Sequence, residues 1–267
     1  GRARSILADH FGALWTRVGL FEELETIARE FSEEGSWTEG WIAVCNTIRS
    51  KSKDLLPEEV ARLRVVEEVL RPTDLLQIAR AYITSKAWEP LGIESPENCE
   101  DIEQKVEQKV KGSRRADERT KEIALDVAKR PEVLDQLLTD LFSVGAGRGW
   151  SFGRGLAAGA ESLTDMWERL VEAFGKSSEC ERNNIQAIRG FLNKAAELDP
   201  QTVGVLLDGA LQHPILAPLF VLLQTSIDID ERAAQRLEEA LDLGWTPAWT
   251  YKELTIGRAT DRIPPTI

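Results

Sequence analysis

Cysteine and histidine, which supply the thiolate and imidazole ligands of zinc sites and many catalytic groups, are scarce in this chain. It has 267 residues, of which only three are cysteine and two are histidine. Cys45, Cys99 and Cys180 form no C-x-x-C pair, a pattern that favours reduced thiols in a cytoplasmic protein over a disulfide framework. No H-E-x-x-H, G-x-S-x-G or Cys/His zinc spacing occurs, and no G-x-x-x-x-G-K-[ST] for ATP. We therefore expect no metal, no cofactor and no catalytic residue within this segment.

Long apolar runs are missing as well. No stretch approaches the roughly 18 consecutive apolar residues that a membrane-spanning helix needs, and no basic-then-apolar leader is present. We expect no membrane span and a cytoplasmic location. The chain has a single methionine, Met166, and it begins at Gly1 inside a helical pattern. We therefore expect it to be a segment of a longer polypeptide.

Basic residues are fewer than acidic ones, 33 against 45. The formal net charge is −12 and the isoelectric point is about 4.9. Such a surface repels phosphate backbones, which disfavours a nucleic-acid partner. The partner that we expect is a protein or a second copy of the parent chain.

Strand-like patterns are also rare, since β-branched runs with alternating polarity do not exceed about four residues. Apolar residues recur instead at helical spacing. The N-terminal stretch predicts two helices that are separated at Gly19, and Pro57, Pro131 and Pro214 each open a further predicted helix, the last one running through Leu223. The predicted fold class is all-α, with about fifteen helices and almost no sheet.

Carboxylates precede several of these helices. Asp228, Asp230 and Glu231 lie together and suggest either a metal site or a helix cap, and we favour the cap because a carboxylate accepts from unpaired N–H groups there. Asp199 carries the same signal, and Pro72-Thr73-Asp74 restarts the chain before a further apolar helix. We therefore expect helices to begin directly after Asp74, Asp199 and either Asp228 or Asp230.

Composition along the chain suggests three segments. Residues 1–87 form a predicted N-terminal helical block, and residues 117–267 form predicted C-terminal helical repeats. Residues 88–116 between them are a predicted connector or hinge with a strongly charged helix. Gly112-Ser113 is predicted to interrupt that helix.

A repeat is visible in the stretch from Trp150 to Leu211. Two Arg-Gly steps each open an apolar helix that is followed by a break and a second helix, and Gly190 follows Gly155 by 35 residues. Gly257 lies 67 residues after Gly190, close to two further repeats. Helix–turn–helix units with this period are typical of an α-solenoid, in which each unit buries its apolar face against its neighbours.

The arginines of these steps are candidate partner-binding residues. Arg154, Arg189 and Arg258 each adjoin a glycine at an equivalent point of the repeat, and Arg148 extends the row. Aligned guanidinium groups can hold a carboxylate-bearing partner through paired hydrogen bonds. The alternative, which we favour, is that each arginine bonds helix carbonyls or pairs with Asp or Glu of the next unit.

The glycine-rich turn at 145–155 also matches a second pattern. The sequence from Gly153 to Ala158 fits the loose G-x-G-x-x-G/A dinucleotide signature, but no strand precedes it and no βαβ unit surrounds it. We interpret the glycines as sites of close helix–helix packing. The alternative function is a nucleotide- or phosphate-binding enzyme domain that uses this turn and the adjoining arginines.

Two tryptophans near the end of the chain are further candidates. Trp245 and Trp249 bracket Pro247, and most other tryptophans fall on predicted apolar faces. Core packing is the default interpretation. The other is an exposed aromatic edge that binds a partner.

The stretches IRGFLNKAAELDPQTVGVLLDGALQHP and IGRATDRIP resemble the HEAT/TPR-like helical-repeat arms of large bacterial multidomain proteins. Those proteins include STAND-type ATPases that serve in antiviral (phage) defence. The resemblance covers roughly residues 145–264 and implies a sensor or oligomer scaffold, with any ATPase activity outside this segment. We therefore predict a non-catalytic scaffold or sensor segment.

Overall fold

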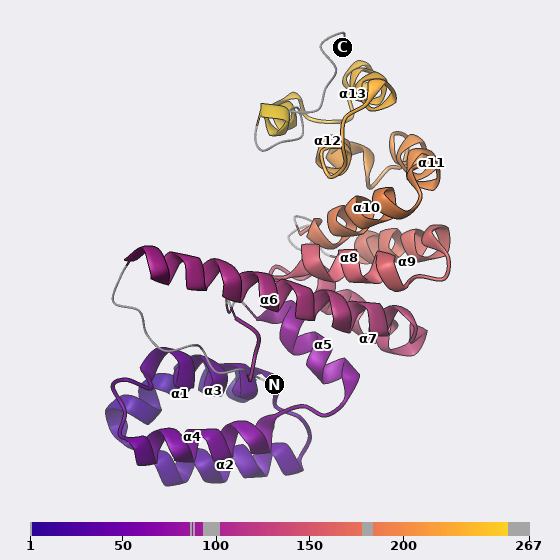
Figure 1. Ribbon diagram of the computed structural model, residues 1–267. Helices are drawn as coiled ribbons and strands as arrows, with labels where there is room; N and C mark the ends of the chain where they lie inside the picture. Colours follow the sequence, from indigo (N-terminus) through magenta and orange to yellow (C-terminus); the bar gives the residue numbers. More distant parts are fainter. Residues whose placement is uncertain (1, 86, 88, 93–101, 178–183, 256–267) are drawn as a thin grey trace. The chain divides into compact units, whose positions relative to one another are not determined.

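Figure 1 shows the computed structural model, which describes residues 2–85, 87, 89–92, 102–177 and 184–255. Within these ranges the regular elements are thirteen α-helices and three short helical segments of π or 3-10 type, with no strand. The all-α prediction is therefore confirmed. The chain divides into two compact units, Gly1–Thr120 and Lys121–Ile267.

Helix α3 is the centre of the first unit. This unit contains α1 (Arg2–Ala13), η1 (Leu14–Val18), α2 (Phe21–Glu33), α3 (Thr38–Lys51), α4 (Pro57–Leu70) and α5 (Leu75–Thr84). Helix α3 packs against α1, α4 and α5, and α2 packs against α4. Phe11, Trp15 and Trp37 are among the largest fully buried side chains, so aromatic rings fill much of this core.

Local sequence signals set the ends of these helices. Gly19 ends the first helix at φ 67°, a left-handed conformation that glycine adopts without steric cost. Pro57 occupies the first turn of α4, and the Glu59 carboxylate accepts a hydrogen bond from the Leu56 N–H at 2.8 Å. The Asp74 carboxylate accepts from the Gln77 N–H at 2.9 Å and caps α5. The predicted starts at Pro57 and after Asp74 are thus confirmed.

Helix α6 (Ile102–Ala128) corrects one expectation, because it runs without interruption through Gly112-Ser113. Gly112 is buried, as are Ala116 and Thr120 at the following four-residue steps, so the glycine lies on a packed face of small side chains. A helical glycine costs about 1 kcal/mol relative to alanine when nothing else compensates. Here its packing outweighs that cost. The predicted segment boundaries at residues 87 and 116 stay predictions.

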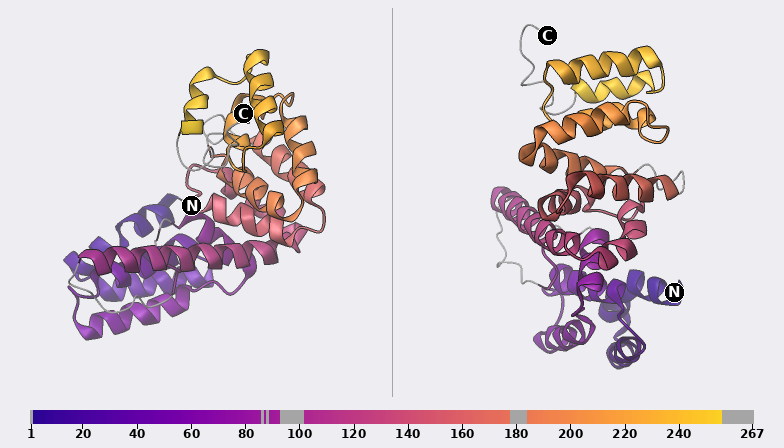
Figure 2. Two further views of the ribbon diagram at one scale, coloured as in Figure 1. Left: turned by 45° about the horizontal axis from the view of Figure 1, so that its top comes forward. Right: turned by 90° about the vertical axis from the view of Figure 1, so that its right-hand side faces the viewer.

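The second unit is built from helices that pack against their neighbours along the chain. It contains the end of α6 and then α7 (Pro131–Phe142), α8 (Gly149–Gly159), α9 (Leu163–Lys176), α10 (Gln186–Leu198), α11 (Pro200–Ala210), η3 (Ala217–Leu219), α12 (Phe220–Gln224), α13 (Glu231–Leu243) and η4 (Ala248–Thr255). Helix α8 packs on α9 and α10, α10 on α11 and α12, and α12 on α13 and η4. Figure 2 shows the helices of this unit in successive layers.

A second expectation is corrected in this unit, because the helix predicted from Pro214 to Leu223 begins later. The His213 carbonyl accepts hydrogen bonds from the N–H groups of Leu216 and Ala217, which closes a turn. Pro218 follows and has no N–H to donate, and its ring disfavours a helical conformation in the residue before it. The α-helix α12 therefore starts only at Phe220.

Candidate functional site

Helix α8 carries two glycine faces that bring its backbone against two other helices. On the side of α10, a β-carbon on Gly153 would overlap the Ala187 carbonyl oxygen and lie 2.8 Å from the Phe191 nitrogen. From α10 in turn, a β-carbon on Gly190 would overlap the Trp150 carbonyl oxygen. Only glycine permits backbones to approach this closely.

The opposite face of α8 packs on α6. A β-carbon on Gly155 would lie 2.6 Å from the Ala124 β-carbon, and one on Gly159 would lie 2.9 Å from the Ala128 β-carbon. The glycines of the predicted dinucleotide pattern therefore lie inside a helix, between two other helices, and not at a strand–helix turn. The interpretation as close helix packing is confirmed, and this packing leaves no space for a pyrophosphate beside Gly153.

The 35-residue recurrence has a physical basis in this arrangement. Gly155 faces α6 and Gly190 faces α8, so each Arg-Gly glycine packs against the helix that lies two elements earlier in the chain. The arginine beside each glycine contacts a residue that comes later in the chain. Each Arg-Gly step thus joins an earlier helix to a later element.

Arg154 reaches from α8 to α10. Its guanidinium donates to the Asn193 side-chain oxygen and, at 2.9 Å, to the Glu197 carboxylate. Glu197 also accepts from Lys194 at 2.8 Å. These contacts, the Lys194 bond first, outweigh the burial that opposes ionisation and hold the pKa of Glu197 below its usual value.

Arg189 reaches from α10 to the end of α12. Its Nε donates to the Ser226 hydroxyl at 3.1 Å, and its guanidinium lies 5.7 Å from the centre of the Trp150 ring. Burial lowers the pKa of Arg189. Asn193, the acceptor for Arg154, donates to the Ser226 carbonyl at 2.7 Å, so one polar network joins α8, α10 and the turn after α12.

The other two predicted arginines add less to this picture. Arg148 is half-buried at the N-cap position of α8, where it makes further contacts. Arg258 lies outside the described residues. The structure thus brings Arg154 and Arg189 into one network through Asn193 and Ser226, and it leaves the predicted row of aligned guanidinium groups as a prediction.

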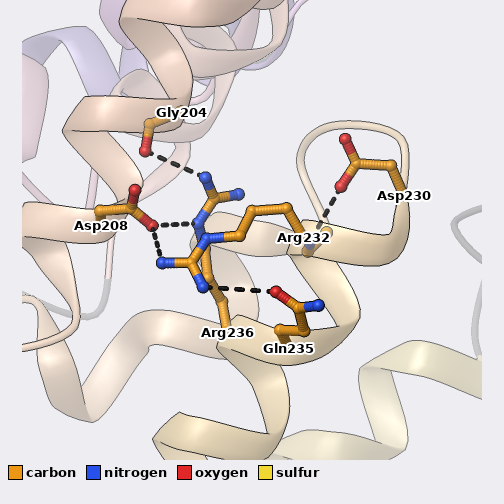
Figure 3. Close-up of polar contacts among 7 residues, drawn as sticks. Gly204, Asp208, Asp230, Arg232, Gln235 and Arg236 are labelled. Carbon is orange, nitrogen blue, oxygen red and sulfur yellow. Dashed lines mark hydrogen bonds and ion pairs between the residues drawn. The ribbon is translucent and has the colours of Figure 1, made fainter.

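A carboxylate–arginine cluster that sequence reasoning missed joins α13 to α11. Arg236 donates from Nε to Asp208 Oδ1 at 2.7 Å and from Nη2 to the Gly204 carbonyl at 3.1 Å. Arg232 donates to the same Asp208 oxygen at 2.9 Å. Figure 3 shows both guanidinium groups turned toward Asp208. Burial opposes ionisation of Asp208, but the two arginines outweigh it and hold the pKa of this carboxyl below its usual value.

This cluster forms part of a cleft of about 650 Å³ between α10, α11 and the start of α13. Its polar lining includes the carboxylates of Glu197, Asp228 and Asp230 together with Arg232 and Arg236. Its described lining residues include no serine, threonine, cysteine, lysine or histidine. The charged side chains that line the cleft are therefore carboxylates and guanidinium groups.

The structure supports the interpretation of the carboxylates at Asp228–Glu231 as a helix cap. Asp230 accepts a hydrogen bond from the Ala233 N–H at 2.7 Å at the start of α13. Asp199 does the same for α11, accepting from the Gln201 and Thr202 N–H groups at 3.1 and 3.0 Å. No group of His, Cys, Asp or Glu side chains suited to a metal ion occurs in the described part of the chain.

The last described hairpin exposes large apolar side chains. Trp245 is 50% exposed and Trp249 is 66% exposed, while Leu241 and Leu243 are 51% and 38% exposed. Elsewhere the hairpin is packed, since the Tyr251 hydroxyl donates to the Leu237 carbonyl at 2.7 Å and Thr250 is buried. We call Leu241, Leu243, Trp245 and Trp249 the terminal apolar edge. Both tryptophans predicted as partner-binding residues belong to it.

No helix within the described ranges has the length and hydrophobicity that crossing a bilayer requires. No family model, no curated protein and no solved structure matches this chain.

Proposed function

We propose that this chain is a non-catalytic helical-repeat segment whose terminal apolar edge binds a protein partner. The observation that carries the proposal is that four large apolar side chains between Leu241 and Trp249 are exposed. Exposed apolar patches of this kind mark interaction sites on soluble proteins, because their burial in a complex removes them from water. Aromatic residues are also enriched at the centres of interfaces.

The packing of the second unit supports an α-solenoid of the HEAT or TPR type. Its helices pack on the elements that are one or two places away in the chain, as α8 does on α9 and α10. Stacked repeats of this kind bury their apolar faces against their neighbours. The terminal apolar edge lies in the last described hairpin.

In this proposal Arg154 and Arg189 hold successive repeats in register, since their donors are used by Asn193, Glu197 and Ser226. Their direct use by a carboxylate-bearing partner is the alternative role. The finer proposal, a cytoplasmic sensor or scaffold arm of a large bacterial protein of the STAND type in antiviral defence, rests on the sequence resemblance alone.

Site-specific photo-crosslinking in the native cell tests the proposal. A photoreactive amino acid replaces Trp249 in one variant and Val205 in the other, because Val205 is 70% exposed on α11 and lies outside the terminal apolar edge. The expected result is a discrete protein adduct from position 249 and none from position 205. Equal adducts from both positions, or none from 249, would contradict the proposal.

A further inference from the structure

Acidic side chains flank the two leucines of the terminal apolar edge along α13. Glu238, Glu239 and Asp242 are exposed on α13, directly before and between the two leucines of the edge. No ion pair in the described part of the chain uses any of these three carboxylates. Arg232 and Arg236 on the same helix share the one carboxylate of Asp208, and α13 carries four acidic residues against these two arginines, so it is net negative. The edge therefore lies in a negative field that its own helix does not neutralise.

The aromatic part of the edge already holds a cation. The Lys252 ammonium lies 5.3 Å from the centre of the Trp249 ring. The face of an indole ring attracts a cation through its quadrupole, and this attraction grows when a partner excludes water. No such cation lies over Trp245 in the described residues. The half-exposed Trp245 ring thus offers a second, open position for an ammonium or guanidinium group.

The negative charge beside the edge favours one kind of binding partner over the others. A second copy of this chain, docked edge to edge, would bring Glu238, Glu239 and Asp242 close to the same residues of its partner. An anionic lipid surface would meet the same carboxylates. Like charges in apposition weaken association and reject wrong partners. The complementary occupant is a protein segment with positive charge.

The backbone chemistry of the edge limits the form of that segment. The described residues contain no strand, so no sheet edge is available to pair with an extended peptide. A partner that buries its own backbone against Trp245 and Trp249 must satisfy its N–H and C=O groups internally. A helix does this, and an amphipathic helix also presents apolar and charged residues on adjoining faces.

Resting on the proposed function, we infer that the terminal apolar edge binds a basic amphipathic helix of a partner protein. Apolar side chains of that helix cover exposed apolar side chains of the edge, the two indole rings among them. Its lysines or arginines meet Glu238, Glu239 and Asp242 and stack on Trp245.

Three labelled peptides of about 18 residues, long enough for five helical turns, test this inference by fluorescence anisotropy with the purified chain. The first is an amphipathic Leu/Lys helix, the second is its Leu/Glu counterpart, and the third carries the same lysines with serine in place of leucine. We expect the Leu/Lys peptide to bind about tenfold or more tightly than either other peptide, and its affinity to fall as salt rises from about 50 to 300 mM.

Variants locate the binding. Two double variants should each weaken Leu/Lys binding about tenfold or more. The first combines Trp245→Ser with Trp249→Ser, and the second combines Glu238→Lys with Asp242→Lys. Val205→Ser should leave Leu/Lys binding unchanged, since Val205 is exposed on α11. Equal binding of the Leu/Glu or Ser/Lys peptide, insensitivity to the edge variants, or tighter binding to phosphatidylglycerol vesicles would overturn the inference. Crosslinking at position 249 to a partner without a basic helix would overturn it while leaving the proposed function intact.

Discussion

The α-carbon of Gly190 in α10 faces the backbone of Trp150 in α8, where a β-carbon would lie 2.8 Å from the carbonyl carbon and overlap its oxygen. Gly153 makes the reciprocal approach from α8. The two helices are therefore in backbone contact along a face without side chains. Any β-carbon at these positions must push the helices apart, and close-packed interiors resist such movement.

Gly190→Ala should accordingly lower the free energy of unfolding by about 3 kcal/mol, at the upper end of the range for overpacked cores. Gly209→Ala is the matched control, since Gly209 is helical and has no atom within 4 Å of an added β-carbon. It should stabilise the protein by about 0.5–1 kcal/mol. Urea denaturation followed by circular dichroism measures both. A Gly190→Ala variant as stable as the parent would refute the backbone contact.

The Asp208 cluster should make the stability of the second unit depend on pH. Because the folded-state pKa of Asp208 lies below its usual value, its stabilising effect is present above the unfolded pKa of about 3.9 and is lost as pH falls through the folded value. Asp208→Asn should therefore lower the urea midpoint at pH 7, and the difference from the parent should shrink toward pH 3. Asp242→Asn, which removes an exposed and unpaired carboxylate, serves as the control. A difference that is constant with pH would contradict this role.

Gln224 is a source of instability that a single substitution can remove. Its side chain is fully buried, and neither Nε2 nor Oε1 has a hydrogen-bond partner in the described part of the chain. Burial of an unpaired amide costs about 1–3 kcal/mol. Gln224→Leu should thus raise the melting temperature, while Gln201→Leu at an exposed position should not. Calorimetry measures both, and a destabilised Gln224→Leu variant would show that the amide is paired in solution.

Cys45 should be inert in the folded protein. Burial, reinforced by the nearby Glu67 carboxylate, raises the pKa of its thiol to about 12. The thiolate, which is the reactive form, is therefore almost absent at neutral pH. In a Cys99→Ser, Cys180→Ser variant, Ellman's reagent should react with Cys45 only after denaturant is added. Rapid reaction without denaturant would contradict its burial.

Local signals in the sequence predicted the helix ends well. Gly19, Pro57, Asp74 and Asp199 act through their own backbone or the next three residues, so their effect does not depend on the rest of the fold. Gly112 was mispredicted because tertiary packing of its helix face, which a local pattern does not contain, outweighs its low helix propensity.

The candidate binding surfaces could be predicted only in part, because some of their residues lie far apart in the sequence. Trp245 and Trp249 were identified because two tryptophans around a proline are conspicuous near the end of a chain. The Asp208–Arg236 pair was not, since its partners lie 28 residues apart and meet only when α13 packs beside α11. An arginine pair one helical turn apart, as at Arg232 and Arg236, was the one local signal available.

Amide hydrogen exchange, measured with and without the partner that crosslinking identifies, tests the central claim most directly. Binding through the terminal apolar edge predicts slower exchange in peptides that cover residues 237–255 and unchanged exchange in those that cover α2 and α3. Protection confined to α7 and α9, or no protection of residues 237–255, would contradict the account.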